Sequence, residues 1–420
     1  MLFAPAAQAK DQNNWVPRGW LSDAWGQSYD YSGGSAPQAE LRRGRPTLSR
    51  KNIAPMKAAI ARYKKIVAKG GWRPIPKAAV KAGLRTGISH PAVALLRKRL
   101  IATGDLRSRS GYSTSFDYYV ANALRRFQTR NGLKPTGDLV DLSRRRNFGS
   151  RTLMALNVPA KARLRQLQTN LRRIRDLSRR VGKRYVMVNL PAAQVEAVEN
   201  DRVVSRHVAV VGKRERASPL LSSTISQVNF NPVWTLPPTV IQKDLIPKGR
   251  KMMRGKKNVL QHYGIDAYSR ATGRKLDPRK INWRSGAVYN YLYRQQPGPD
   301  NPLGFVKINF PNKYSVYMHD TPKKTIFGRN IRAASSGCIR VQNIEKLITW
   351  LLNKNPGWSR SRVTDMRRSG KRLDVGLKAR TRVHFVYVTA WATGDGPVNF
   401  RRDVYRKDQR YGVSRMAANY

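Results

Sequence analysis

The sequence predicts an α+β protein in which a helical N-terminal region precedes a β-rich domain. Up to Gly182, apolar residues recur at the three-to-four-residue spacing of amphipathic helices. After Gly182 the hydrophobic period changes to two, which is typical of strands. A third observation is a long stretch, 235–302, in which the strand rhythm fails and Pro, Gly, Lys and Tyr dominate. We interpret this stretch as an insertion in the β-rich domain.

The helical elements are expected at 53–69, 90–102, 116–131, 150–156 and 162–180. Gly70 ends the first helix, Pro91 lies in the first turn of the second, and Gly132 follows the third. Each helix is amphipathic and too short to be stable alone, so they should pack together. We expect a helical scaffold at 51–85, a three-helix module at 86–160 and a scaffold or linker helix at 161–182.

The β-rich domain is expected at 183–391, with strands at 185–190, 203–211, 222–230, 305–310, 315–319 and 382–391. One clear helix, 344–352, interrupts them. Long ordered insertions usually act as lids or binding loops, and the 235–302 insertion carries aromatic residues that suit ligand contacts. These are Tyr263, Tyr268, Trp283, Tyr289, Tyr291 and Tyr293. The alternative is a structural subdomain with its own core. Residues 392–420 read as a basic C-terminal tail.

Composition and charge limit the possible partners. The chain has 420 residues, enough for two or three domains, and 40% of them are hydrophobic, which excludes wholesale disorder. Lys and Arg number 82 against 24 Asp and Glu, a net charge of +58. A charge of this size indicates polyanionic surroundings: nucleic acid, an anionic membrane surface or anionic cell-wall polymer. No apolar run approaches the length of a membrane span.

The N-terminus resembles the end of a secretory signal. Residues 1–9 finish in Ala7-Gln8-Ala9, a small-x-small step typical of a cleavage site, but a charged first region and a full apolar region are missing. We therefore interpret residues 1–9 as a truncated signal remnant and 10–50 as a basic irregular arm. Export would make the single cysteine unusual, since oxidising compartments favour paired cysteines or none.

That cysteine, Cys338, lies in a segment suited to nucleophilic catalysis. Gly337 allows close backbone approach, and the following helix and the arginines at 332 and 340 would favour a thiolate. His319 ends an apolar strand and is the candidate base, with His262 in the insertion as the next candidate. Without further signal, an inert buried cysteine and a structural histidine would be the simpler reading.

The flanking residues resemble the L,D-transpeptidase catalytic domain. That family has a histidine, about fifteen residues, and then Ser/Thr-His-Gly-Cys; here 320–334 separates His319 from Ser335-Ser336-Gly337-Cys338. Further matching segments lie at 210–213, 231–238, 243–247, 297–299, 303–307, 310–312 and 317–322. The wider match is to the family's large periplasmic branch, with a scaffold, a binding module and a substrate-capping insertion. The resemblance covers roughly residues 50–390, and it departs from the family at Ser336 and Arg340.

The three-helix module resembles a peptidoglycan-binding domain. The matching segments are 93–97, 123–128, 131–133 and 152–157. Such domains usually have a short Asp-Gly turn before the last helix, whereas residues 138–148 are longer here and contain three consecutive arginines. The binding groove is therefore expected to be altered.

These resemblances imply an acyl transfer in which Cys338 is the nucleophile and His319 the base. The amides of Gly337 and Cys338 would stabilise the oxyanion, with Ser335 and Ser336 in support. Substrate contacts are implied for a further group of residues, Arg340, Tyr317, Trp234 and Asn231. No cofactor and no metal are implied. The expected partners are peptidoglycan stem peptides and the sacculus, outer-membrane protein acceptors and carbapenem inhibitors, and the expected location is the periplasm.

Two other functions remain open. A nucleic-acid-binding protein would fit the charge, but zinc spacing, a helix-turn-helix pattern and an aromatic stacking strip are not found, so no specific nucleic acid is expected. A non-catalytic peptidoglycan-binding envelope protein is conceivable because Ser336 replaces the family histidine. A serine D,D-transpeptidase is disfavoured because the chain has no Ser-x-x-Lys.

Overall fold

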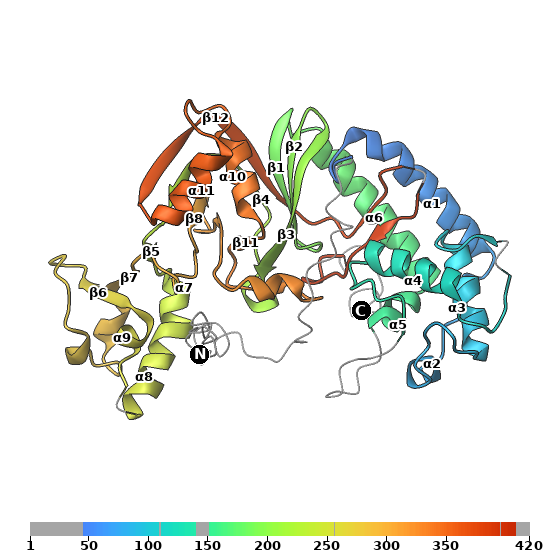
Figure 1. The fold of residues 1–420 in the computed structure, drawn as a ribbon, viewed down its shortest axis with the longest axis horizontal. Coiled ribbons are helices and arrows are strands. Elements are labelled where there is room, and N and C mark those ends of the chain that lie inside the picture. The colour runs from blue at the N-terminus through green and yellow to red at the C-terminus, as the bar shows by residue number, and fades with distance from the viewer. Residues whose placement is uncertain (1–44, 109–110, 140–150, 256, 395, 409–420) are drawn as a thin grey trace, which may run out of the picture.

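The computed structural model describes residues 45–108, 111–139, 151–255, 257–394 and 396–408. The predicted signal remnant, most of the basic arm, the arginine-rich part of the 138–148 segment and the last twelve residues lie outside this range. The α+β prediction is confirmed: Figure 1 shows a helical unit at one end, a large sheet in the middle and the insertion at the other end. None of the described helices combines the length and hydropathy that a membrane crossing needs.

The helical unit forms from two packed groups of helices. Its helices are α1 (Ile53–Ala68), α2 (Ala78–Lys81), α3 (Pro91–Ala102), α4 (Tyr118–Arg130), α5 (Arg151–Leu156) and α6 (Ala160–Ser178). The helix starts follow from local chemistry, because the Asp117 side chain accepts from the Val120 amide and Pro91 occupies the first turn of α3. Helices α2 to α5 enclose one apolar core, while α1 and α6 pack on strands of the sheet.

The central sheet has nine strands in the order β10-β3-β11-β9-β8-β4-β12-β1-β2. Because β2 also pairs with β3, the sheet closes on itself. Helices α10 (Ile344–Leu352) and α11 (Arg360–Ser369) complete the main core. The strands are β1 (Arg184–Asn189), β2 (Gln194–Glu199), β3 (Arg202–Gly212), β4 (Leu221–Phe230), β8 (Val306–Asn309), β9 (Met318–His319), β10 (Ala333–Ser335), β11 (Ile339–Val341) and β12 (Leu373–Val386).

Three expectations for this domain were wrong in detail. The strand expected at 315–319 is reduced to Met318–His319, because Ser315 has a φ of 53° and belongs to a turn. The strand expected at 382–391 begins much earlier, at Leu373, and ends at Val386. A second helix, α11, accompanies α10, although only one clear helix was expected.

The insertion is a folded unit with its own core. It contains β5 (Trp234–Thr235), α7 (Pro238–Val240), a π-helical turn (Ile241–Leu245), α8 (Ile246–Arg254), α9 (Val259–Tyr263), β6 (Ile265–Ser269), and β7 (Tyr291–Gln295), together with two 3-10 turns, Pro278–Lys280 and Gly286–Tyr289. Tyr263, Trp283 and Tyr293 are buried in this core, so the expectation that they offer faces to a ligand was wrong. Tyr289 is exposed.

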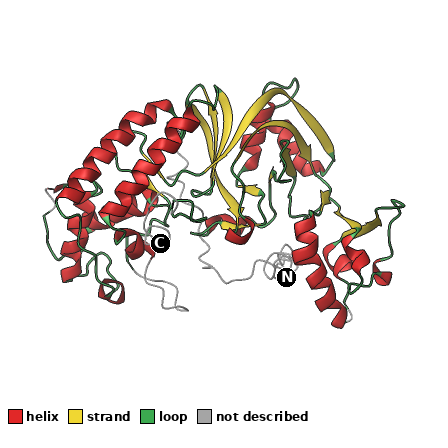
Figure 2. Cartoon of the chain, turned by 180° about the vertical axis from the view of Figure 1, so that it is seen from behind, coloured by secondary structure: helices red, strands yellow, loops and turns green. Residues whose placement is uncertain are grey.

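The segment expected to be a basic tail is partly structured. Strand β14 (Asn399–Phe400) pairs with β13 (Ala390–Trp391), and Asp403 and Asp408 are buried. Arg401 donates to the carbonyl of Arg130, and Arg130 in turn donates to that of Val398, each at 2.9 Å. These bonds join the C-terminal segment to the end of α4. Seen from behind in Figure 2, the helices and the insertion flank the sheet on opposite sides.

Candidate active site

Strand register brings four of the sequence-predicted residues onto one face of the sheet. Strands β9 and β11 are parallel, with His319 opposite Arg340. Because side chains two residues apart share a face, Tyr317 and Cys338 lie on that same face. Lys307 of β8 is the strand partner of His319, so its side chain lies on the same face. Met318 and Ile339 point the other way, into the main core.

The Cys338 thiol is partly buried beside Tyr317. Burial raises the pKa of the thiol, while hydrogen bonds from Tyr317 and the positive charges of Lys307 and Arg340 act in the opposite direction. At neutral pH the resting site therefore holds the protonated thiol.

His319, on the same face of the sheet, is held neutral. The residue is 4% exposed, and its ring lies 5.6 Å from that of Tyr317, centroid to centroid. Burial, followed by the positive charges of Arg340 and Lys307, lowers the pKa of His319 to about 3, and the peptide groups of Asp320 and Pro302 oppose this. A neutral imidazole can accept a proton.

Two cations complete the surroundings of the thiol. Arg340 is 5% exposed, and burial lowers its pKa to about 10, so it is charged at neutral pH. The ammonium of Lys307 lies 4.6 Å from the centroid of the Tyr317 ring, and burial lowers its pKa. Sequence reasoning missed Lys307, although a lysine between the buried Val306 and Ile308 was the available signal.

A turn at 213–218 holds the loop at 335–338. Lys213 N donates to Ser335 O at 2.9 Å, and Ser218 Oγ donates to Gly337 O at 2.7 Å. Gly212 is needed here because a Cβ would collide with the backbone of this turn. Gly337 itself has a φ of 125°, which favours glycine.

The amide of Gly337 is already engaged in this loop. It donates to Ser335 Oγ at 3.2 Å, and the same hydroxyl donates to the Cys338 carbonyl at 2.5 Å. In this state, therefore, the Gly337 amide does not point its N–H at an oxyanion, as was expected. The Ser335 hydroxyl instead links two backbone groups of the same loop.

Ser336, the residue that replaces the family histidine, contacts an arginine. Arg216 Nη1 donates to Ser336 Oγ at 2.8 Å and to Asp244 Oδ2 at 2.5 Å. Arg216 Nη2 donates to the other carboxylate oxygen of Asp244 at 3.1 Å. Nothing in the sequence near Cys338 signalled Arg216 or Asp244.

The remaining predicted residues are placed differently. Trp234 Nε1 donates to the Tyr317 hydroxyl at 3.1 Å, so Trp234 adjoins the site through Tyr317. Asn231 Nδ2 instead donates to the carbonyls of Met366 and Lys371, both at 2.8 Å, at the end of α11. His262 lies on α9 in the insertion, against the ring of Tyr263.

One electrostatic expectation for the thiol was wrong. Strand β11 separates Cys338 from α10, which begins only at Ile344, so the thiol does not lie at that helix's N-terminus. Arg332 donates to the carbonyls of Arg329 and Ala192, and the main positive charges that lower the pKa of the thiol are those of Lys307 and Arg340.

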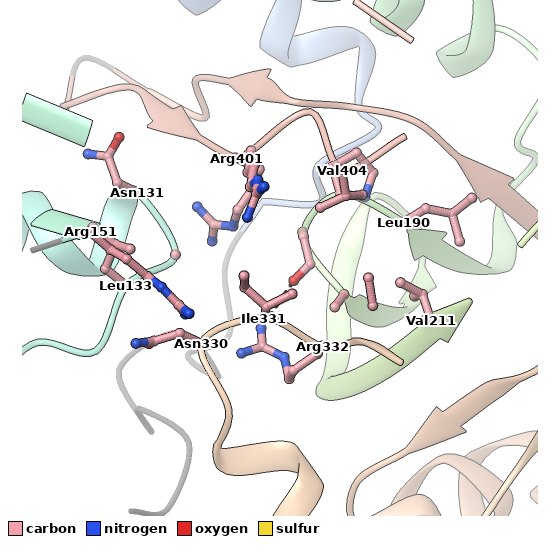
Figure 3. Close-up of a pocket in the computed structure, with 16 residues that line it drawn as sticks. Asn131, Leu133, Arg151, Leu190, Val211, Asn330, Ile331, Arg332, Arg401 and Val404 are labelled. Carbon is pink, nitrogen blue, oxygen red and sulfur yellow. Dashed lines mark hydrogen bonds between the residues drawn. The ribbon is translucent and has the colours of Figure 1, made fainter. Parts of the chain in front are cut away.

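A separate pocket lies between the helical unit and the sheet domain (Figure 3). It is lined by the end of α4, by residues 330–333 and by residues of the C-terminal segment such as Arg401. Neither Cys338 nor His319 lines it. Within the described ranges, no group of three or more His, Cys, Asp or Glu side chains is arranged to hold a metal ion.

Comparisons with known proteins agree with the resemblance. Residues 183–375 match the family described as "L,D-transpeptidase catalytic domain", and residues 89–139 match "Putative peptidoglycan binding domain". A Haemophilus influenzae protein named "Putative L,D-transpeptidase" is 31% identical over 232 residues, which are 55% of this chain and 46% of that protein. The chain thus matches about half the length of this curated relative.

Solved structures of L,D-transpeptidases are also similar to the chain. One from Stackebrandtia nassauensis is 13% identical, with coverage of 73% of this chain and 95% of that chain and a TM-score of 0.26. LdtMt1 in complex with imipenem is 12% identical, with coverage of 49% and 59% and a TM-score of 0.23. The chain is therefore similar to L,D-transpeptidase catalytic domains over residues 183–375 and to putative peptidoglycan-binding domains over residues 89–139.

Proposed function

We propose that the chain transfers acyl groups from peptidoglycan tetrapeptide stems through a thioester on Cys338. The observation that carries this proposal is the strand register, which puts Cys338, His319, Tyr317 and Arg340 on one face. The family match of residues 183–375 supports the reaction class. The products are 3→3 cross-links or envelope proteins attached to diaminopimelate.

The reaction begins from a neutral thiol and a neutral imidazole. As Cys338 Sγ bonds to the carbonyl carbon between the third and fourth stem residues, His319 takes the thiol proton. The carbon–nitrogen bond then breaks, and the proton passes to the departing D-alanine amine. The side-chain amine of diaminopimelate on a second stem attacks the thioester, gives a proton to His319 and restores the thiol.

Other groups near the thiol are assigned to oxyanion stabilisation, orientation and substrate binding. Because the Gly337 amide donates to Ser335, we assign oxyanion stabilisation to the Cys338 amide, while the Tyr317 hydroxyl bonds the thiol; losing one oxyanion donor typically costs about 2.7–4 kcal/mol. Trp234 orients that hydroxyl. The planar fork of Arg340 suits a stem carboxylate, and Lys307 adds positive charge. Asn231 supports the fold beside α11.

The other domains bring the enzyme to its polymer. We propose that the insertion at 235–302 covers bound stems. We also propose that the helical module binds the sacculus. The charge of +58 would attract the chain to the anionic wall, and we propose the periplasm as its location. Outer-membrane proteins are further candidate acceptors.

The direct test is a carbapenem adduct on the only cysteine. LdtMt1 was solved with imipenem, and the same inhibitor should add its own mass to this protein. Cys338→Ala should abolish both the adduct and product formation from disaccharide-tetrapeptide, as measured by intact mass and by product mass. An adduct on the alanine variant would contradict Cys338 as the nucleophile, and a wild type that binds stems without turning them over would favour the non-catalytic envelope protein instead.

The role of the insertion has its own test. Tyr289 is 45% exposed, and unlike its buried neighbours it can meet a sugar ring. Tyr289→Ala should therefore slow turnover of the muropeptide more than acylation by imipenem. Equal effects on both reactions would contradict a capping role for this residue.

A further inference from the structure

The 213–218 turn contacts three consecutive residues of the 335–338 loop. Its backbone binds Ser335, its Ser218 hydroxyl binds Gly337, and the Arg216 side chain binds Ser336. The first two contacts lie within the sheet domain. The third differs, because the same guanidinium is paired with a carboxylate of the insertion.

The Arg216 pair with Asp244 is bidentate and largely shielded from water. The two side chains are 11% and 6% exposed, and both carboxylate oxygens accept from the guanidinium. Asp244 lies in the π-helical turn Ile241–Leu245, a local geometry often found at functional sites. Removing one member of such a buried pair is strongly destabilising, because it leaves the other charge buried without its counter-ion.

We propose that Arg216 is a positioning residue that couples the insertion to the 335–338 loop through Asp244 and Ser336. This inference rests on the proposed function, because it assigns to Arg216 the positioning of the loop that carries the proposed nucleophile. When the insertion is seated, Asp244 fixes the guanidinium and the guanidinium fixes Ser336, two residues before the thiol. When the insertion moves away, Arg216 loses the Asp244 carboxylate and no longer holds Ser336 in place, so the loop loses one of its three contacts.

Ser336 suits this arrangement because its hydroxyl is a small acceptor. An imidazole at this position would bring a bulky, titratable ring against a guanidinium, and the positive charge would disfavour its protonated form. The replacement at 336 is thus matched by a residue 120 positions earlier in the chain. The insertion also adjoins the thiol through Trp234 and Tyr317, so a seated insertion acts on both sides of the site.

A double-mutant cycle between Asp244 and Ser336 tests the coupling. Asp244→Asn and Ser336→Ala should each slow acylation by imipenem about tenfold or more, the expected loss for a hydrogen bond to a charged group. The double variant should be no slower than the slower single variant, because both changes break one chain of contacts. Arg216→Lys keeps the charge but loses the fork, so it should match the double variant.

Two measurements separate positioning from stability. Ser336→Ala loses one hydrogen bond, so its thermal unfolding midpoint should fall by only a few degrees, and the variant should remain fully folded at the assay temperature while its acylation slows. Asp266→Asn is the matched control: it breaks an ion pair of the insertion with the exposed Lys275, and acylation should stay within about twofold of the wild type. Losses in the double variant that equal the product of the single losses would overturn the coupling.

Amide hydrogen exchange tests the same inference without any reaction. In Asp244→Asn, peptides that span 335–338 should exchange faster than in the wild type, and in Asp266→Asn they should not. Unchanged exchange in Asp244→Asn would overturn the coupling. If exchange at 335–338 differs between the wild type and Asp244→Asn as expected, but the wild type forms no imipenem adduct, the proposed function is refuted and the coupling is not.

Discussion

Replacing Tyr317 with phenylalanine should raise the pKa of the Cys338 thiol. The Tyr317 hydroxyl hydrogen-bonds the thiol and lowers its pKa, against the larger effect of burial. A hydrogen bond to a charged group is worth about 1.5–3 kcal/mol, and one pKa unit corresponds to about 1.36 kcal/mol. Tyr317→Phe should therefore raise the thiol pKa, and the loss of that hydrogen bond should lower the thiolate population at neutral pH about tenfold or more.

The single cysteine makes the measurement clean, because all alkylation by iodoacetamide reports on Cys338. The alkylation rate, followed by intact mass across a pH series, should rise with thiolate population and give the pKa of each protein. The phenylalanine variant also leaves Trp234 Nε1 without its acceptor, so its unfolding midpoint should be recorded alongside. Tyr289→Phe, on the exposed side of the insertion, is the matched control. A thiol pKa in Tyr317→Phe equal to or below that of the wild type would refute the reasoning.

Three further outcomes are expected. Burial lowers the folded-state pKa of His207 to about 4 and that of His319 to about 3. Below pH 6.5 the unfolded chain therefore binds protons that the folded chain does not, and the free energy of unfolding should decrease as the pH falls. A thermal midpoint equal at pH 5 and pH 7.5 would contradict this. Asp105→Asn leaves the buried Arg130 without its carboxylate and should cost about 3–5 kcal/mol in urea unfolding, whereas Lys275→Gln, at an exposed pair, should cost under about 1 kcal/mol. Sacculus binding should fall steeply between 0.1 M and 1 M salt, as the Debye length falls from about 10 Å to about 3 Å, while imipenem acylation changes little; salt-independent retention in a pull-down would point to a specific pocket.

The sequence predicted the periodic elements well, because burial sets their pattern. Helix α10 was expected at its observed bounds, and α1 differs from expectation by one residue at its end. Strand β2 was missed because Glu and Ala have weak strand preference. Helix α11 was missed because its arginines leave only Val363 and Met366 buried.

The candidate site was only partly predictable for a related reason. His319, Cys338 and Arg340 lie close together in sequence, and the motif spacing pointed to them. Arg216 lies 28 residues from Asp244, and their pairing depends on where a turn and an insertion meet in space. Likewise, the apolar faces of Trp283 and Tyr293 carry no local mark that distinguishes a core position from a ligand contact.

The C-terminal segment has a mechanical consequence for the whole molecule. Through Arg401 it is bonded to the end of α4, and through the Tyr405 hydroxyl it donates to the Gly212 carbonyl at 2.6 Å, next to the 213–218 turn. The helical module and the thiol are therefore tied at a set separation, without the entropy of a flexible tether. If the module binds a polymer with regularly repeating stems, as proposed, this fixed separation would determine which stem lies within reach of Cys338.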